Sequence, residues 1–129
     1  AHGRPLSRQD AVVTVHSAEE VAAVLRLANR LNVPVTPFGG GSGVQGAANA
    51  DRGGILLNLY QMKRIRALDE QSLTCTVECG MTVRDFEAHL NERGLSFTHY
   101  PASAEWATIG GCLAARGSGV LSTKYGKIE

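Results

Sequence analysis

The chain has 129 residues, 43% of them hydrophobic, and its 13 basic and 12 acidic side chains give a net charge of +1. A chain of this length can bury about two thirds of its unfolded surface, so one compact domain needs no disulfide support. The balanced charge and the lack of a basic block argue against nucleic acid as a partner. No apolar run approaches the roughly 20 residues of a membrane span, so we expect no transmembrane segment.

Cysteine usage indicates the redox setting. Cys75, Cys79 and Cys112 are an odd number and include no Cys-x-x-Cys pair, which supports neither a disulfide framework nor a zinc site. We therefore expect a reducing, cytoplasmic location. The composition also permits a homo-oligomer.

The first elements predicted are a strand, a helix and a second strand. Residues 11–15 form a short β-branched run, and Ser17-Ala18-Glu19-Glu20 has the capping-box form of a helix start. An apolar stripe at three- and four-residue spacing continues the helix to residue 32, and its members are Val21, Val24, Leu25, Ala28 and Leu31. Residues 33–38 read as the next strand. This βαβ pattern predicts a helix packed on a small sheet.

The middle of the chain predicts three more strands, at residues 55–59, 64–69 and 73–79. The last of these alternates strictly and places Leu73, Cys75, Val77 and Cys79 on one face, so core packing is expected for both cysteines. Thr82 can cap a helix that ends near Arg93, with Gly94 as its left-handed C′ residue. The whole pattern predicts an α+β fold.

A glycine-rich loop follows the second strand, with five glycines within the eight residues 39–46. Glycine admits positive φ and leaves room for main-chain N–H groups to converge on phosphate oxygens, so we expect an anion site. Gly40 in particular is expected to need positive φ, with pyrophosphate oxygens where a side chain would stand. The alternative is a surface turn without a ligand.

A second stretch, residues 101–119, is rich in small residues around a helix capped by Thr108. Such a cap would leave the N–H groups of Gly110 and Gly111 free to meet an anion. Tight helix packing explains the same two glycines equally well.

Together the two stretches resemble the FAD-binding domain of the FAD-linked oxidases, which are the vanillyl-alcohol-oxidase-like or PCMH-type flavoproteins. The family pattern Pro-x-Gly-Gly-Gly-[Ser/Thr] is met at residues 37–42, and a later Pro-x-Ser-x-x-x-x-Thr-[Ile/Val]-Gly-Gly pattern is met at residues 101–111. The resemblance implies a βαβ subdomain and the start of a second mixed-sheet subdomain. It also implies that residues 1–10 are an N-terminal tail and that residues 11–129 are an FAD-binding domain truncated at its C-terminus, before the substrate domain.

The resemblance implies a set of cofactor-contacting residues and no catalytic or metal-binding ones, since the chemistry of such enzymes lies downstream. Residues 38–46 contain no histidine for covalent attachment, so FAD should be bound non-covalently. The implied contact residues are Phe38, Gly39, Gly40, Gly41, Ser42, Gly43, Val44, Pro101, Ala102, Ser103, Thr108, Gly110, Gly111, Ala114, Arg116, Gly117 and Ser118.

Two subfamilies share features with the chain. Residues 107–111 and 124–126 resemble glycolate and D-lactate dehydrogenases, whereas residues 116–119 and 125–129 resemble alkyldihydroxyacetonephosphate synthases. The resemblance implies an FAD-dependent oxidoreductase that oxidises a small 2-hydroxy acid. It also implies that the missing domain binds this substrate. The alternatives are a synthase-like flavoenzyme and a cofactor-free structural or partner-binding module.

A Rossmann dinucleotide site is a further alternative, since Gly41-Ser42-Gly43-Val44-Gln45-Gly46 satisfies Gly-x-Gly-x-x-Gly. The residues after it lack the apolar periodicity of the helix that such a fingerprint opens, which argues against it.

Other conspicuous side chains are assigned no function. The histidines, at positions 2, 16, 89 and 99, lack the spacing of paired metal ligands and are expected at the surface or in packing. Trp106 has no assigned role. Glu105 and Arg116 could pair with each other or with the cofactor, and a solvated ion pair is the default expectation.

Overall fold

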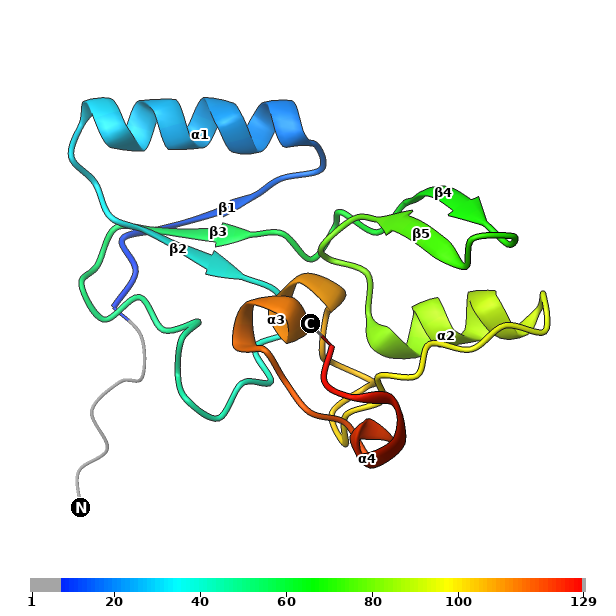
Figure 1. Cartoon of the computed structure of the whole chain (residues 1–129). Coiled ribbons are helices and arrows are strands. Elements are labelled where there is room, and N and C mark those ends of the chain that lie inside the picture. Colours follow the sequence, from blue (N-terminus) through cyan, green and yellow to red (C-terminus); the bar gives the residue numbers. More distant parts are fainter. Residues whose placement is uncertain (1–7, 129) are drawn as a thin grey trace, which may run out of the picture.

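The computed structural model describes residues 8–128, and its first part is a parallel sheet covered by one helix. Strands β1 (Ala11–Thr14), β2 (Val35–Phe38) and β3 (Ile55–Asn58) lie in the order β1-β3-β2. Helix α1 (Ala18–Arg30) covers one face of this sheet (Figure 1). Of the tail expected at residues 1–10, residues 1–7 lie outside the described chain, and the Asp10 N–H donates to the Gly54 carbonyl at 2.9 Å.

Helix α1 has the start and end that its sequence predicts. The Glu20 N–H donates to the Ser17 hydroxyl at 3.2 Å, and Asn32 ends the helix at φ 52°. Val21 and Val24 pack on the sheet core and Ala28 is buried. The expected inward position of Leu25 and Leu31 is wrong, because both lie at the edges of the stripe beside a narrow sheet and remain 45% and 59% exposed.

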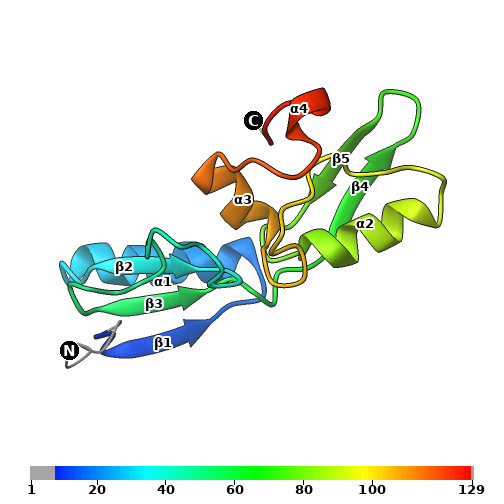
Figure 2. The same ribbon diagram turned by 90° about the horizontal axis from the view of Figure 1, so that it is seen from below.

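The second part contains a hairpin and three helices. Strands β4 (Ile65–Asp69) and β5 (Thr74–Val77) pair antiparallel, and helix α2 (Val83–Asn91) lies against them. Helix α3 (Ile109–Ala115) lies on the side of this part that faces the parallel sheet, and α4 (Ser122–Tyr125) follows it (Figures 1 and 2). The predicted α+β class is therefore confirmed. One hydrophobic cluster holds this part together, and its buried members are Met81, Val83, Phe86, Leu90, Ala104, Ala107, Ile109 and Cys112.

The expected apolar face at residues 73–79 is only partly correct. Cys75 and Val77 pack against the cluster of the second part, as predicted. Leu73 instead lies in the hairpin turn at φ 55° and is 72% exposed, because the turn leaves only residues 74–77 for the strand. Cys79 follows the strand and packs against the core of the parallel sheet.

The caps of α2 follow the prediction. The Asp85 N–H donates to the Thr82 hydroxyl at 3.1 Å. At the other end Gly94 has φ 69°, and the Leu95 N–H donates to the Leu90 carbonyl at 3.1 Å, as in a Schellman motif. Among the helices of residues 8–128, none is both long and apolar enough to cross a membrane.

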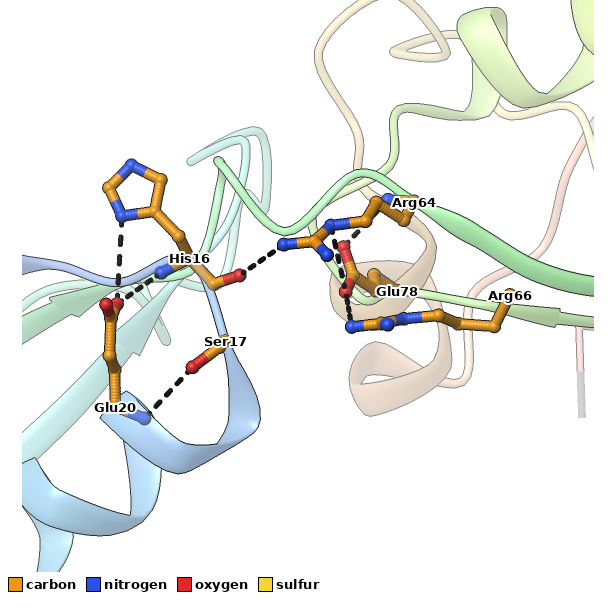
Figure 3. A network of polar contacts seen from close by, with 6 residues as sticks. All are labelled: His16, Ser17, Glu20, Arg64, Arg66 and Glu78. Carbon is orange, nitrogen blue, oxygen red and sulfur yellow. Dashed lines mark hydrogen bonds and ion pairs between the residues drawn. The ribbon is translucent and has the colours of Figure 1, made fainter.

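A buried carboxylate links the two parts. Glu78 has only 6% of its side chain exposed, accepts the Arg64 N–H at 2.7 Å and pairs with the guanidinium of Arg66. The Arg64 guanidinium in turn reaches the carbonyl of His16, at the start of α1, at 3.5 Å (Figure 3). The hydrogen bond from the Arg64 main chain, followed by the Arg66 side chain, lowers the pKa of Glu78.

We expect Glu78→Gln to destabilise the protein at pH 7 and to have little effect in acid. A lowered folded-state pKa means that the carboxylate contributes stability above its reference pKa of 4.5 and loses it as the pH falls through the folded value. Thermal melting of both proteins between pH 7 and pH 3 is the measurement. Glu70→Gln, in an exposed pair with Arg93, is the control and should show no comparable pH dependence. If Glu78→Gln lowered the melting temperature equally at pH 7 and at pH 3, this role of Glu78 would be contradicted.

Candidate functional site

A cavity of about 670 Å³ lies between the glycine-rich loop and the segment 99–118. The loop leaves the carboxyl end of β2 and runs along the side of the sheet opposite α1 before it enters β3 (Figure 1). Ligands of open α/β sheets bind outside the carboxyl ends of parallel strands, so the cavity stands where such a fold places a ligand.

The glycine-rich loop offers a run of free hydrogen-bond donors. Within the described chain, none of the N–H groups of residues 39–45 donates to another protein group, and the first that does is that of Gly46, to the Gly43 carbonyl at 3.4 Å. Phosphate oxygens are the acceptors that such successive main-chain donors suit. The residues 39–54 form no helix, so the Gly-x-Gly-x-x-Gly match does not open one and the Rossmann interpretation is wrong.

Two of the loop glycines are required by contact with the second part of the chain. A Cβ at Gly39 would stand 2.4 Å from the Thr108 Oγ1, and a Cβ at Gly40 would stand 1.6 Å from the Trp106 carbonyl oxygen. The expectation that Gly40 needs positive φ is wrong, because Gly41 takes that role at φ 65°. Gly40 instead lets two backbones touch. A Cβ at Gly43 would meet no protein atom within 4 Å.

The segment that the loop touches is itself fixed to α2. The Val83 N–H donates to the Ala107 carbonyl at 2.9 Å, and the Ile109 N–H donates to the Met81 carbonyl at 2.8 Å. Thr108, between these bonds, is 2% exposed. The cavity wall at 106–109 is therefore set by main-chain bonds on one side and by the glycine loop on the other.

The expectation that the N–H groups of Gly110 and Gly111 are free at the start of α3 is wrong. Thr108 does cap the helix, but the Gly110 N–H donates to the Cys79 carbonyl at 2.9 Å and the Gly111 N–H donates to the Thr108 hydroxyl at 3.3 Å. A Cβ at Gly110 would stand 2.6 Å from the Cβ of Cys79. Tight packing, the alternative interpretation, accounts for Gly110, and the free donors belong to the loop at 39–45.

The structure brings nearly all of the implied contact residues to this one cavity. Ala102 and Arg116 do not line it: Ala102 is exposed, and Arg116 ends α3 at φ 50°. The suggested pair of Glu105 with Arg116 does not form in the described chain, since Glu105 binds the Arg84 guanidinium at 3.0 Å. Those that line the cavity are Phe38, Gly39, Gly40, Gly41, Ser42, Gly43, Val44, Pro101, Ser103, Thr108, Gly110, Gly111, Ala114, Gly117 and Ser118.

Sequence reasoning missed three titratable side chains that line the cavity, which are those of Cys79, His99 and Cys112. Burial raises the pKa of both thiols, so they stay protonated and neutral at pH 7. No motif marks them, because they come from three separate segments. None of the described lining residues is Lys, Arg, Asp or Glu, so an anion here would be held by main-chain dipoles.

Comparison with known proteins relates the chain to flavoproteins. Alkyldihydroxyacetonephosphate synthase of Dictyostelium discoideum is 35% identical over 98% of this chain and 21% of its own length. The mitochondrial D-lactate dehydrogenase [cytochrome] of Arabidopsis thaliana is 35% identical over 99% of this chain and 24% of its own. The glycolate oxidase subunit GlcD of Bacillus subtilis is 31% identical over 93% and 26%. The chain thus spans about a fifth to a quarter of the length of these relatives.

Comparison of the fold with solved structures finds one of the same relatives. A solved structure of alkyldihydroxyacetonephosphate synthase superposes with a TM-score of 0.83 at 34% identity, over 90% of this chain and 22% of that one. The family model described as an FAD binding domain matches residues 9–129, which include the whole cavity. Because this match covers nearly the whole chain, the chain belongs to the FAD binding domain family.

Proposed function

We propose that the loop at residues 39–43 holds the pyrophosphate of non-covalently bound FAD through its main-chain N–H groups, with residues 101–118 on the other side of the cofactor. The observation that carries this proposal is the run of main-chain donors without protein acceptors beside an uncharged cavity. Gly39 and Gly40, at the start of the loop, pack against Thr108 and Trp106, so this part of the loop is in place before a ligand arrives. The loop has no histidine that could bond covalently to the flavin.

We further propose that the full-length protein is an FAD-dependent oxidoreductase that oxidises a small 2-hydroxy acid. Support comes from the similarity to a D-lactate dehydrogenase and to a glycolate oxidase subunit. Bound FAD would supply the hydride acceptor, and the residues of this chain bind and orient it. The substrate would be held by a further domain, and three free thiols favour a reducing, cytoplasmic location.

A synthase-like flavoenzyme is the second candidate. It is favoured by 35% identity to alkyldihydroxyacetonephosphate synthase and by the TM-score of 0.83 with a structure of that enzyme class. The two candidates use the same cavity for the same cofactor, so they differ in substrate rather than in the site described.

Gly43→Val should weaken FAD binding by the full-length protein without unfolding it. The new side chain meets no protein atom at its Cβ but enters the space before the loop donors. Charge-assisted hydrogen bonds are each worth about 1.5–3 kcal/mol, so we expect FAD affinity to fall by roughly ten- to a hundredfold. Flavin absorbance per protein and calorimetric titration of the apoprotein measure this. Normal FAD occupancy in the variant would place the pyrophosphate elsewhere.

Gly40→Val serves as the comparison, because this change should destabilise the apoprotein itself. Its Cβ overlaps the Trp106 carbonyl oxygen, so the apoprotein itself should lose about 1–3 kcal/mol of unfolding free energy. Gly43→Val should leave that free energy within about 0.5 kcal/mol. Urea unfolding of both apoproteins is the measurement. If the two variants were equally destabilised, the division between a packing glycine and a ligand glycine would be incorrect.

The two candidate activities can be separated by anaerobic titration of the purified full-length protein. Under the proposed function, D-lactate or glycolate bleaches the oxidised flavin spectrum, because the substrate carbon transfers a hydride equivalent to the flavin. A flavin that neither acid bleaches, together with formation of alkyldihydroxyacetonephosphate, would establish the second candidate instead.

A further inference from the structure

His99 is the one described residue with buried side-chain polar atoms that lack any hydrogen-bond partner. The residue is 4% exposed, and both Nδ1 and Nε2 are enclosed and unpartnered. Buried polar groups in folded proteins are satisfied almost without exception, because an unmade hydrogen bond costs the full desolvation penalty. An imidazole in this condition calls for a partner that the described chain does not supply.

The ring lies at the wall of the cofactor cavity. His99 is among the residues that line the cavity, together with Gly117, whose missing Cβ would stand 3.8 Å from the His99 Cε1 and 3.9 Å from its Nε2. At position 117, therefore, no side chain stands over the edge of the ring that carries Nε2. Rotation of the ring by 180° about Cβ–Cγ exchanges nitrogens with carbons at nearly unchanged shape, so either nitrogen can be turned to a ligand.

The backbone around His99 is fixed on both sides, which makes accidental placement a poor explanation. Before it, the Phe97 N–H donates to the Glu87 carboxylate at 2.6 Å, and the Phe97 ring packs edge-on against that of Phe86 at 5.1 Å. After it, the Val120 N–H donates to the Tyr100 carbonyl at 2.9 Å. The main chain is thus held to α2 and to the segment after α3, while the ring itself has no polar contact.

The electrostatic setting keeps this imidazole neutral. Burial lowers the pKa of His99, and no charged group of residues 8–128 contributes to the shift. The other titratable groups of the cavity wall are the thiols of Cys79 and Cys112, both neutral. The ring therefore offers one N–H donor and one acceptor nitrogen at pH 7.

We propose that His99 is a ligand-contacting residue of this cavity, whose neutral imidazole forms a hydrogen bond to a polar atom of bound FAD. The proposal rests on the proposed FAD site. It explains why a histidine is enclosed without a partner beside an uncharged wall: the cofactor completes the pair. As a consequence, His99 lowers the stability of the apoprotein but strengthens FAD binding. A residue that serves only in packing would not show these opposite effects.

The test uses His99→Leu and His99→Gln in the full-length protein. An apolar residue removes the enclosed nitrogens, so His99→Leu should unfold at the same or a higher urea concentration than wild type as apoprotein. The same change should raise the FAD dissociation constant by roughly ten- to a hundredfold, measured by calorimetry with FAD itself. His99→Gln, which keeps a donor and an acceptor, should recover part of that affinity.

A spectroscopic signature checks the contact directly. With ¹⁵N-labelled histidine, the ring nitrogens of His99 should report a neutral imidazole in the apoprotein, and one of them should shift when FAD is added. Unchanged FAD affinity in His99→Leu, or ring signals that do not respond to FAD, would overturn the proposal. If wild type itself failed to bind FAD, the proposed function would fail, and with it the proposal that rests on it.

Discussion

The contact of Gly40 with the Trp106 carbonyl oxygen is the constraint on which the site depends. A Cβ at Gly40 would stand 1.6 Å from that oxygen, so only glycine fits there. The glycine loop and the segment 101–108 therefore meet backbone to backbone. This contact joins the loop that leaves the parallel sheet to the part of the chain built on α2. The start of the loop is thereby positioned without a ligand, and such preorganisation favours anion binding by main-chain N–H groups.

The bond from Arg64 to the His16 carbonyl complements this contact at the opposite side of the junction. Glu78 holds Arg64 and Arg66 while only 6% of its side chain is exposed, and Arg64 reaches the start of α1 (Figure 3). The charged groups of the junction are therefore satisfied outside the cavity. None of the described residues that line the cavity is Lys, Arg, Asp or Glu, so the field that an anion would meet there comes from oriented peptide dipoles.

Local signals predicted the helix caps well, and contacts between distant segments account for the errors at the candidate site. Ser17 with Glu20, and Gly94 after α2, form caps whose residues all lie within one or two turns, so the sequence alone indicates them. The N–H of Gly110 is taken by Cys79, thirty-one positions earlier, and no periodicity reveals such a bond. The same holds for His99: its unpartnered nitrogens and its place in the cavity wall depend on packing between distant segments, which no sequence pattern marks. The two glycine-rich motifs indicated the residues of the cavity because both line it, whereas the free donors follow only from how the segments pack.

The similarity of the chain to two enzyme classes is explained by the packing that the cavity requires. A D-lactate dehydrogenase and an alkyldihydroxyacetonephosphate synthase are both 35% identical to it, although their names describe different reactions. The steric requirements found here, at Gly39 and Gly40 against the 106–108 segment and at Gly110 against Cys79, concern how backbones approach one another around a cofactor. None of them concerns a substrate. A region whose sequence is constrained by cofactor geometry is expected to be shared by enzymes that differ in chemistry, so its similarity to a relative identifies the cofactor more strongly than the reaction.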